Sequence, residues 1–381
     1  MDWDTLLADC IAFAQRLIRT PSMPGEEGPL AALVAEALRR LGYDEVWGDA
    51  VGNVYGRLYG VDRSLPALVL NTHLDHVDPG DLSLWPSPPF AATIVGDRLV
   101  GRGACDIKGP LATQVYAGAA LRRAGRRPPR DVVFCGVVQE EVGGAGAIYW
   151  AEHLDYPVAL IVLGEPSGNT LALGHRGILQ LWLTFQGRSV HASAPERGHN
   201  PNYALAAFLG QLEGAVAALP PHPILGPTSV APTILQVDTT SGNVTPAWAR
   251  VLLDFRTATE SVDSLTALID RLAGDAPHTV AYAEGLEPPG RSSAPLAGFY
   301  TPPHSPLVTR AAAAIAGGLG RPPALTRYRF ATDGRHFAPH GLPVVGFAPG
   351  EEEQAHTAGE SISLAEMGEN LRGLVALLEK F

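Results

Sequence analysis

At residues 67–75 the sequence is Ala67-Leu68-Val69-Leu70-Asn71-Thr72-His73-Leu74-Asp75, an apolar run that passes directly into polar side chains. The run at 67–70 is continuously apolar, which is typical of a strand buried on both faces of a sheet. Helical stretches such as 110–123 separate it from similar runs at residues 132–138, 159–163 and 344–347. Buried strands alternating with helices predict an α/β/α domain built on a mixed sheet.

The middle of the chain has a different pattern. From Ile178 to Phe185 apolar and polar residues alternate, as in a half-buried strand. Further on we expect a helix, two strands, a second helix and a last strand at residues 203–219, 228–237, 247–255, 262–272 and 279–283. This β-α-β-β-α-β order is ferredoxin-like. We therefore predict an inserted α+β lid at 178–285, within a discontinuous domain of residues 1–177 and 286–381.

Composition excludes several classes of protein. Of the 381 residues 46% are hydrophobic and 18% charged, which is typical of a globular chain and not of a disordered one. The net charge of −11 argues against a basic surface for nucleic acid. The three cysteines are too few and too irregularly spaced for a disulfide framework. Without a basic leader or a long apolar stretch, we expect a soluble cytoplasmic protein with no nucleic-acid or membrane partner.

Polar side chains follow each of the predicted buried strands, and one more acid precedes a predicted helix. They are His73, Asp75, Asp106, Glu140, Glu141, Glu165 and His356. Ligands of open α/β sheets bind beyond the carboxyl ends of the strands, so we expect these groups to converge. Imidazole and carboxylate ligands together suit Zn, Co or Mn. The groups exceed the needs of one tetrahedral ion, so we predict two ions that share a carboxylate.

Each piece taken alone has an ordinary explanation. A lone His-x-Asp is most often a surface coincidence, a Glu-Glu pair is usually a solvated face, and Asp106 alone would serve as a helix cap. The joint pattern is different, because charged side chains are rarely left unpaired at the ends of buried strands. The combination favours a metal site.

The motifs resemble those of the co-catalytic zinc metallopeptidases and amidohydrolases, a family that includes acetylornithine deacetylase, succinyl-diaminopimelate desuccinylase, aminoacylase and glutamate carboxypeptidase. The resemblance covers essentially the whole chain, lid included. Its motifs here are His73-x-Asp75, Gly101-Arg102-Gly103 through Asp106-x-Lys108-Gly109, Glu140-Glu141, Glu165-Pro166 and Ala355-His356-Thr357. It implies that His73 and Glu165 bind one metal ion, Glu141 and His356 the other, and Asp106 both.

The resemblance also implies catalytic roles. Asp75 orients His73, and Glu140 is the general base, which takes a proton from a water between the two ions and returns it to the leaving amine. His191, in Ser189-Val190-His191-Ala192-Ser193, stabilises the tetrahedral oxyanion, from its own chain or from a partner subunit. The alternative for His191 is an ordinary core or surface residue. The positions that match substrate contacts are Asn243, Arg256, Arg335 and Gly350.

The expected reaction is hydrolysis of the amide bond of an N-acyl amino acid, in the manner of a deacetylase or desuccinylase. A dipeptidase or carboxypeptidase acting on short peptides is the alternative, and a non-catalytic binding protein of the same fold is a remote one. The sheet edge of the lid predicts a homodimer. His76 stands where Thr is common in the family, and we expect it to be a substrate contact or a surface residue.

Overall fold

The computed structural model describes residues 2–283 and 298–381, and the chain divides into two compact units. The first unit is Met1–Gly174 with Tyr300–Phe381, and the second is His175–Phe299. The predicted lid begins at Ile178, inside the second unit. Its predicted end, between residues 285 and 286, lies outside the described residues. The two units are described in turn.

The first unit is built on a mixed sheet with the order β1-β2-β6-β3-β7-β15-β8-β13, in which β14 also pairs with β8. The strands are β1 (Glu45–Gly48), β2 (Val54–Leu58), β3 (Ala67–His73), β6 (Val132–Val137), β7 (Val158–Leu163), β8 (Leu171–His175), β13 (Phe299–Tyr300), β14 (Leu325–Tyr328) and β15 (Val344–Gly346). Strands β3, β6, β7 and β15 run parallel, whereas β2 and β8 pair antiparallel to their neighbours. The predicted α/β fold with a mixed sheet is confirmed.

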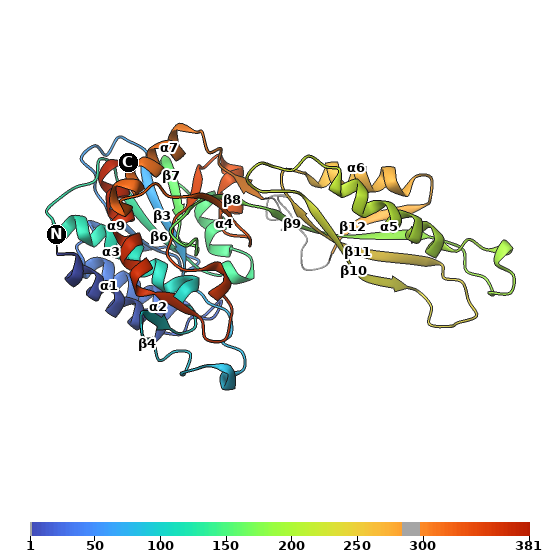
Figure 1. The fold of residues 1–381 in the computed structure, drawn as a ribbon, viewed down its shortest axis with the longest axis horizontal. Coiled ribbons are helices and arrows are strands. Elements are labelled where there is room, and N and C mark those ends of the chain that lie inside the picture. Colours follow the sequence, from blue (N-terminus) through green and yellow to red (C-terminus); the bar gives the residue numbers. More distant parts are fainter. Residues whose placement is uncertain (1, 284–297) are drawn as a thin grey trace. The chain divides into compact units, whose positions relative to one another are not determined.

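Helices cover this sheet. They are α1 (Trp3–Ile18), α2 (Gly28–Arg40), α3 (Gly109–Arg123), α4 (Ala145–Glu152), α7 (Pro306–Leu319), α8 (Gly334–Phe337) and α9 (Leu364–Lys380). Helices α1, α3, α9 and α7 pack side by side in one layer (Figure 1). All residues of β3 and β6 are buried, as continuous apolar runs require. Within the described ranges, no helix combines the length and apolar character needed to cross a bilayer.

A small antiparallel sheet joins distant parts of the first unit. It consists of β4 (Thr93–Val95), β5 (Arg98–Val100) and β16 (Ser361–Ser363). The β5–β16 pairing places Val100 opposite Ser361, although the two residues are far apart in the sequence. The glycine-rich loop after β5 therefore lies next to the segment that contains His356.

The parallel strands present their carboxyl ends at one edge of the large sheet. His73 is the last residue of β3, Glu140 and Glu141 follow β6, and Glu165 follows β7. The predicted site residues therefore meet at the edge where open α/β sheets bind ligands.

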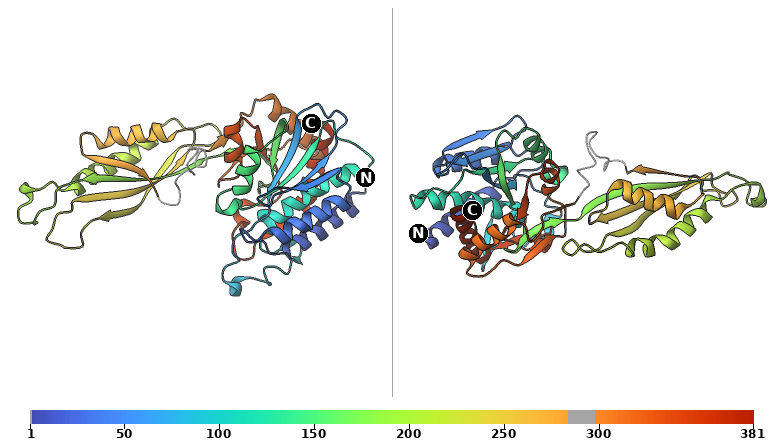
Figure 2. Two further views of the ribbon diagram at one scale, coloured as in Figure 1. Left: turned by 180° about the vertical axis from the view of Figure 1, so that it is seen from behind. Right: turned by 90° about the horizontal axis from the view of Figure 1, so that it is seen from above.

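The second unit contains β9 (Gly177–Gln186), α5 (Pro201–Ala217), β10 (Ser229–Val237), β11 (Trp248–Thr257), α6 (Val262–Ala273) and β12 (His278–Tyr282). Its antiparallel sheet has the order β10-β11-β9-β12, and α5 and α6 lie on one face of it (Figures 1 and 2). Residues of β9 alternate between buried and half-buried, as the sequence pattern predicted. The element order and the strand order confirm the ferredoxin-like fold.

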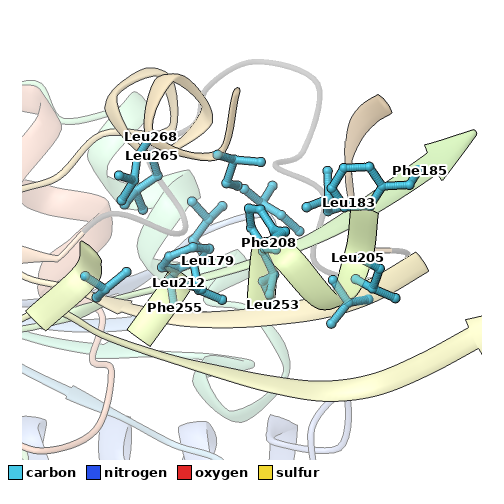
Figure 3. Close-up of a cluster of buried hydrophobic side chains, with 14 of the residues drawn as sticks. Leu179, Leu183, Phe185, Leu205, Phe208, Leu212, Leu253, Phe255, Leu265 and Leu268 are labelled. Atoms are coloured by element: carbon cyan, nitrogen blue, oxygen red, sulfur yellow. The ribbon is translucent and has the colours of Figure 1, made fainter. Parts of the chain in front are cut away.

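The core of the second unit lies between this sheet and the two helices. Leu179, Leu183 and Phe185 of β9 face Phe208 and Leu212 of α5 (Figure 3). The rings of Phe185 and Phe208 are 5.9 Å apart in an edge-to-face arrangement. These contacts bury an apolar face that neither the sheet nor the helices could bury alone.

We expect Phe208→Ala to lower the free energy of unfolding by about 3–5 kcal/mol, because it leaves a cavity in this core. Phe208 is only 1% exposed, whereas Glu213 on the same helix is exposed. Glu213→Ala is therefore the control and should change stability by less than about 0.5 kcal/mol. Urea denaturation followed by circular dichroism measures both. Equal effects of the two variants would contradict the assigned core.

Candidate metal centre

Asp106 lies at the centre of the predicted site. It sits in a π-helical turn, Ala104–Lys108, with non-helical backbone angles (φ −119°, ψ 82°) just before α3. One carboxylate oxygen, Oδ1, is 2.9 Å from Nε2 of His73, and the other, Oδ2, is 3.2 Å from Nε2 of His356. The two oxygens of one carboxylate thus face two different imidazoles.

Each imidazole has a second carboxylate beside it. Nε2 of His73 is 3.9 Å from Oε1 of Glu165, and Nε2 of His356 is 3.0 Å from Oε1 of Glu141. Ligand atoms of His73, Asp106 and Glu141 lie within 4.8 Å of one another. The structure therefore brings together all five residues predicted to hold metal, as two pairs that share Asp106.

The electrostatics of the site favour bound cations. Burial lowers the pKa of His73, but its hydrogen bonds to Asp106 and Asp75 outweigh this and raise the pKa well above its usual range. Hydrogen bonds to Asp106 and Glu141 raise the pKa of His356 to about 10. Burial raises the pKa of Glu165 well above its ordinary value. Buried carboxylates that exceed their nearby positive charges are costly unless cations neutralise them.

Asp75 connects this site to the Glu140-Glu141 pair. Nδ1 of His73 is 3.1 Å from the backbone carbonyl of Asp75 and 3.4 Å from its carboxylate. The same carboxylate accepts hydrogen bonds from the backbone N–H groups of Glu140 and Glu141, both at 3.1 Å. Such partners fix the orientation of metal-binding imidazoles. The sequence suggested only the contact with His73, so the contacts with the two glutamates are new.

Glu140 is buried beside the site. Burial raises the pKa of its carboxyl well above the ordinary range, and the nearby Asp333 raises it further. Gln139, the residue before it, has a left-handed backbone (φ 60°). Non-glycine residues in this conformation are strained and cluster at functional sites.

Arg335 and Asp333 contribute charges near Glu140. The positive charge of Arg335 opposes the upward shift of the Glu140 pKa. Nε of Arg335 donates to Nε2 of His336 at 3.1 Å. Asp333 is buried, and burial raises the pKa of its carboxyl to about 7. The sequence had singled out Arg335, whereas Asp333, two residues before it, was not predicted to belong to the site.

The second unit holds three further predicted site residues. His191 and Asn243 are close together. His191 forms an isolated antiparallel β-bridge with Val244, and the N–H of Ala192 donates to the Asn243 carbonyl at 2.8 Å. Asn243 precedes the first residue of β11, whereas Arg256 lies next to its last residue. Nε of Arg256 donates to Oδ1 of Asp254 at 2.9 Å. The second unit therefore separates Arg256 from the other two residues.

Comparison with known proteins identifies the family. The model of peptidase family M20/M25/M40 matches residues 69–380, which include all five predicted metal ligands. The chain belongs to this family. The succinyl-diaminopimelate desuccinylase of Dinoroseobacter shibae is 29% identical over 95% of this chain and 96% of its own length.

Solved structures agree with this M20 assignment. The aminopeptidase PepT from Bacillus cereus superimposes with a TM-score of 0.77 at 21% identity, covering 100% of this chain and 99% of its own. A dinuclear metal-binding M20 peptidase from Bacillus subtilis gives 0.71 at 15% identity, with coverage of 99% and 100%. At such low sequence identities, these superpositions show that the fold is shared and nothing more. The predicted family is confirmed, and this M20 chain is a metal-dependent hydrolase of amide or peptide bonds.

Gly350 of the M20 chain is explained by packing. Its φ of 99° favours glycine, and a Cβ there would lie 2.6 Å from Sγ of Cys105. Its N–H donates to Oε2 of Glu366 at 2.8 Å, and its carbonyl accepts from the N–H of Gly168. A substrate contact by Gly350 stays a prediction, but the fold alone requires this glycine.

The alternative that His76 is a surface residue was wrong, and the alternative of a substrate contact stays a prediction. The His76 side chain is 0% exposed, and both nitrogens of its ring form hydrogen bonds within the chain. The N–H of Ser22 donates to Nε2 at 3.0 Å, and Nδ1 donates to the carbonyl of Val77 at 2.8 Å. These partners require a neutral imidazole with its proton on Nδ1. A sequence pattern could not reveal this, because Ser22 belongs to a distant loop.

The neutral state of His76 predicts how stability depends on pH. Burial lowers the pKa of His76 from 6.5 to about 4. Below pH 6.5 the unfolded chain binds a proton that the folded chain resists, so this residue's contribution is lost as the pH falls toward 4. We expect His76→Gln to lose less unfolding free energy than the wild type between pH 7 and pH 5 in urea titrations. An equal loss in both proteins would contradict the assignment.

Proposed function

We propose that this M20 enzyme hydrolyses the amide bond of an N-acyl amino acid at a centre for two divalent ions. The observation that carries the proposal is the position of Asp106, whose two carboxylate oxygens face His73 and His356 separately. Glu165 and Glu141 complete the two sets of donors. Relatives that are 29–31% identical are named desuccinylases, which favours an N-acyl amino acid over a larger peptide.

The donors fit Zn, with Co or Mn as alternatives, because imidazole and carboxylate are the ligands that these ions share. Such ions, when bound, polarise the scissile carbonyl and make a coordinated water more acidic. Glu140 then accepts a proton from the attacking water and donates it to the leaving nitrogen. The raised pKa of its carboxyl suits a group that must both take and return a proton near neutral pH.

Arginines supply the recognition of the substrate's carboxylate. A guanidinium binds a carboxylate through two parallel hydrogen bonds, which a lysine cannot do. Arg335 is in the first unit, near Glu140, and Arg256 is in the second. We assign both to the substrate, together with the backbone at Gly350, and we assign Asn243 to the substrate with its neighbour His191.

His191 is proposed to donate to the oxyanion. The N–H of Ser193 donates to its Nδ1 at 3.1 Å, so the neutral ring carries its proton on Nε2. His191 is exposed, and a ring with its proton on Nε2 can donate to a developing negative charge.

The distances along β11 favour action of His191 across a dimer. Asn243 and His191 lie beyond the Trp248 end of β11, and Arg256 lies near its other end. The eight steps from residue 248 to residue 256 span about 26 Å of strand. An N-acyl amino acid, comparable to two extended residues, spans about 7 Å. His191 and Arg256 of one chain therefore do not both serve the same small substrate, and we assign His191, with the neighbouring Asn243, to the partner's site.

The edge of the second unit's sheet is the proposed dimer interface. Strand β10 is at the edge, and its residues are exposed or half-exposed along its length. Ile234, Leu235 and Val237 are exposed apolar side chains on it. Unpaired edge strands with apolar residues tend to pair with another strand, here a second copy across a two-fold axis.

Hybrid dimers test the contribution of His191. His191→Ala and Glu140→Gln each inactivate a homodimer, but a mixed dimer contains one site with both residues intact if His191 acts across the interface. We expect activity to return on mixing under subunit exchange, toward a quarter of the wild-type level at equal amounts. Mixtures that stay inactive, although native mass spectrometry detects mixed dimers, would contradict the assignment.

A substrate panel tests the proposed reaction. The metal-reconstituted enzyme is assayed with N-succinyl, N-acetyl and aminoacyl derivatives of several amino acids, with a chelator-treated control. We expect the highest kcat/KM for an N-acyl amino acid with a free carboxylate. Higher values for dipeptides would favour the peptidase alternative, and no turnover of any amide would contradict the proposal.

We also propose a cytoplasmic location. Cys10, Cys105 and Cys135 are all buried free thiols, which suits a reducing compartment. Fractionation of the native cells, with the activity outside the cytoplasmic fraction, would contradict this.

A further inference from the structure

We infer that Glu360 is a positioning residue that holds the loop presenting Asp106, an inference that rests on the proposed metal-binding role of Asp106. Glu360 is 0% exposed. Its Oε1 accepts hydrogen bonds from the backbone N–H groups of Cys105 at 2.8 Å and Asp106 at 2.9 Å. Its Oε2 accepts from the N–H of Gly103 at 3.0 Å and from Nη1 of Arg102 at 2.7 Å.

The loop needs such an acceptor because its backbone is irregular. Gly103 has a left-handed φ of 79°, and Asp106 has non-helical angles inside a helical turn. Cys105 and Asp106 are buried, and a buried N–H without a partner costs about 1–3 kcal/mol. The carboxylate of Glu360 supplies these N–H groups with a partner. It thereby fixes the backbone from which the Asp106 carboxylate extends toward His73 and His356.

Glu360 also links the two metal ligands, because it lies in the same short segment as His356 and accepts hydrogen bonds from the loop that carries Asp106. It follows His356 by four residues in the sequence. Its backbone carbonyl accepts from the N–H of Gly101 at 2.9 Å, and Ser361 pairs with Val100 in the small sheet. One short segment therefore supplies the ligand His356 and holds the loop that supplies Asp106. The spacing between these two ligands depends on Glu360.

The charge of Glu360 matters as well as its shape. Arg102 is buried beside Glu360, and its Nη1 forms an ion pair with the Glu360 carboxylate at 2.7 Å, so this buried carboxylate has a positive partner. The guanidinium carbon of Arg102 lies 5.1 Å from the ring centre of Trp85, which holds the arginine in place. All four groups around Glu360 are donors. Glutamine at this position would turn an NH₂ group toward two of those donors and lose both hydrogen bonds.

Zinc affinity is the readout that separates positioning from general stability. We expect Glu360→Gln to weaken zinc binding about 10–100-fold in competition with a chromophoric chelator, as is typical of residues that support metal ligands. We also expect kcat to fall while the KM for the substrate stays within about twofold. Glu360→Asp, which keeps the charge but withdraws the oxygens, should fall between Gln and the wild type.

Asp131→Asn is the matched control. Asp131 is also a buried carboxylate that accepts a backbone N–H, that of Gly60 at 2.8 Å, but it precedes β6, at the strand end opposite the metal centre. It should lower thermal stability and leave zinc affinity unchanged. If Glu360→Gln binds zinc within twofold of the wild type, the inference is wrong.

Hydrogen exchange decides the question even if both Glu360 variants fail to fold. In the metal-free wild type, we expect the amides of Gly103, Cys105 and Asp106 to exchange slowly, because Glu360 holds them without metal. Fast exchange that slows only after zinc is added would overturn the inference. A wild type that binds no zinc would instead refute the proposed function, so the two failures are distinguishable.

Discussion

Replacing Glu140 by glutamine should lower kcat by about 10²–10⁴-fold, the usual contribution of a general acid–base residue. The amide cannot take a proton from water at neutral pH. Its volume is nearly unchanged, and Asp75 bonds to the backbone of this residue, so the fold of the site should persist. Because Glu140 is not among the proposed ligands, zinc content per chain should equal that of the wild type.

The matched control for this variant is Glu353→Gln, which removes an equal charge from an exposed position paired with Arg329. It should leave kcat within about twofold. Steady-state kinetics with the best amide substrate, together with metal analysis of each protein, makes the comparison. Full activity of Glu140→Gln would refute its role as the base, and loss of zinc from it would show that Glu140 is a ligand.

Asp106→Asn should abolish activity by disrupting both metal positions at once. Asparagine has one acceptor oxygen, so it cannot replace a carboxylate whose two oxygens face His73 and His356. It also removes one negative charge from the centre. We expect at least a 100-fold loss of zinc affinity, beyond the 10–100-fold expected for a supporting residue. Equilibrium dialysis against buffered zinc measures this, with Asp131→Asn as the control.

An Asp106→Asn protein that still retained two zinc ions per chain at wild-type affinity would contradict the bridging role. Retention of one ion would assign Asp106 to a single position. These outcomes separate a shared carboxylate from two independent sites.

The sequence predicted those parts of the fold and the site that follow from local pattern. Continuous apolar runs identified β3, β6 and β7, and the polar residues that follow these apolar runs identified His73, Glu140 and Glu165. The alternation in β9 and the order of the following elements identified the second unit's fold. In each case, local spacing carried the information.

What the sequence missed depends on contacts between distant segments. Glu360 meets Asp106 across 254 positions, and His76 meets Ser22 across 54. Nothing near Glu360 in the sequence distinguishes it from the half-buried Glu352 or the exposed Glu353, because its role arises from the pairing of β5 with β16. Asp333 was missed for a similar reason, since its effect on Glu140 requires the folded chain.

The most direct test of the two-metal centre is to titrate the metal-free enzyme with zinc and measure the rate of amide hydrolysis at each ratio of zinc to chain. The two-ion centre predicts negligible activity without metal and a plateau reached at two zinc ions per chain. Hydrolysis at the full rate by the metal-free chain, or a plateau at one ion, would contradict the two-metal centre.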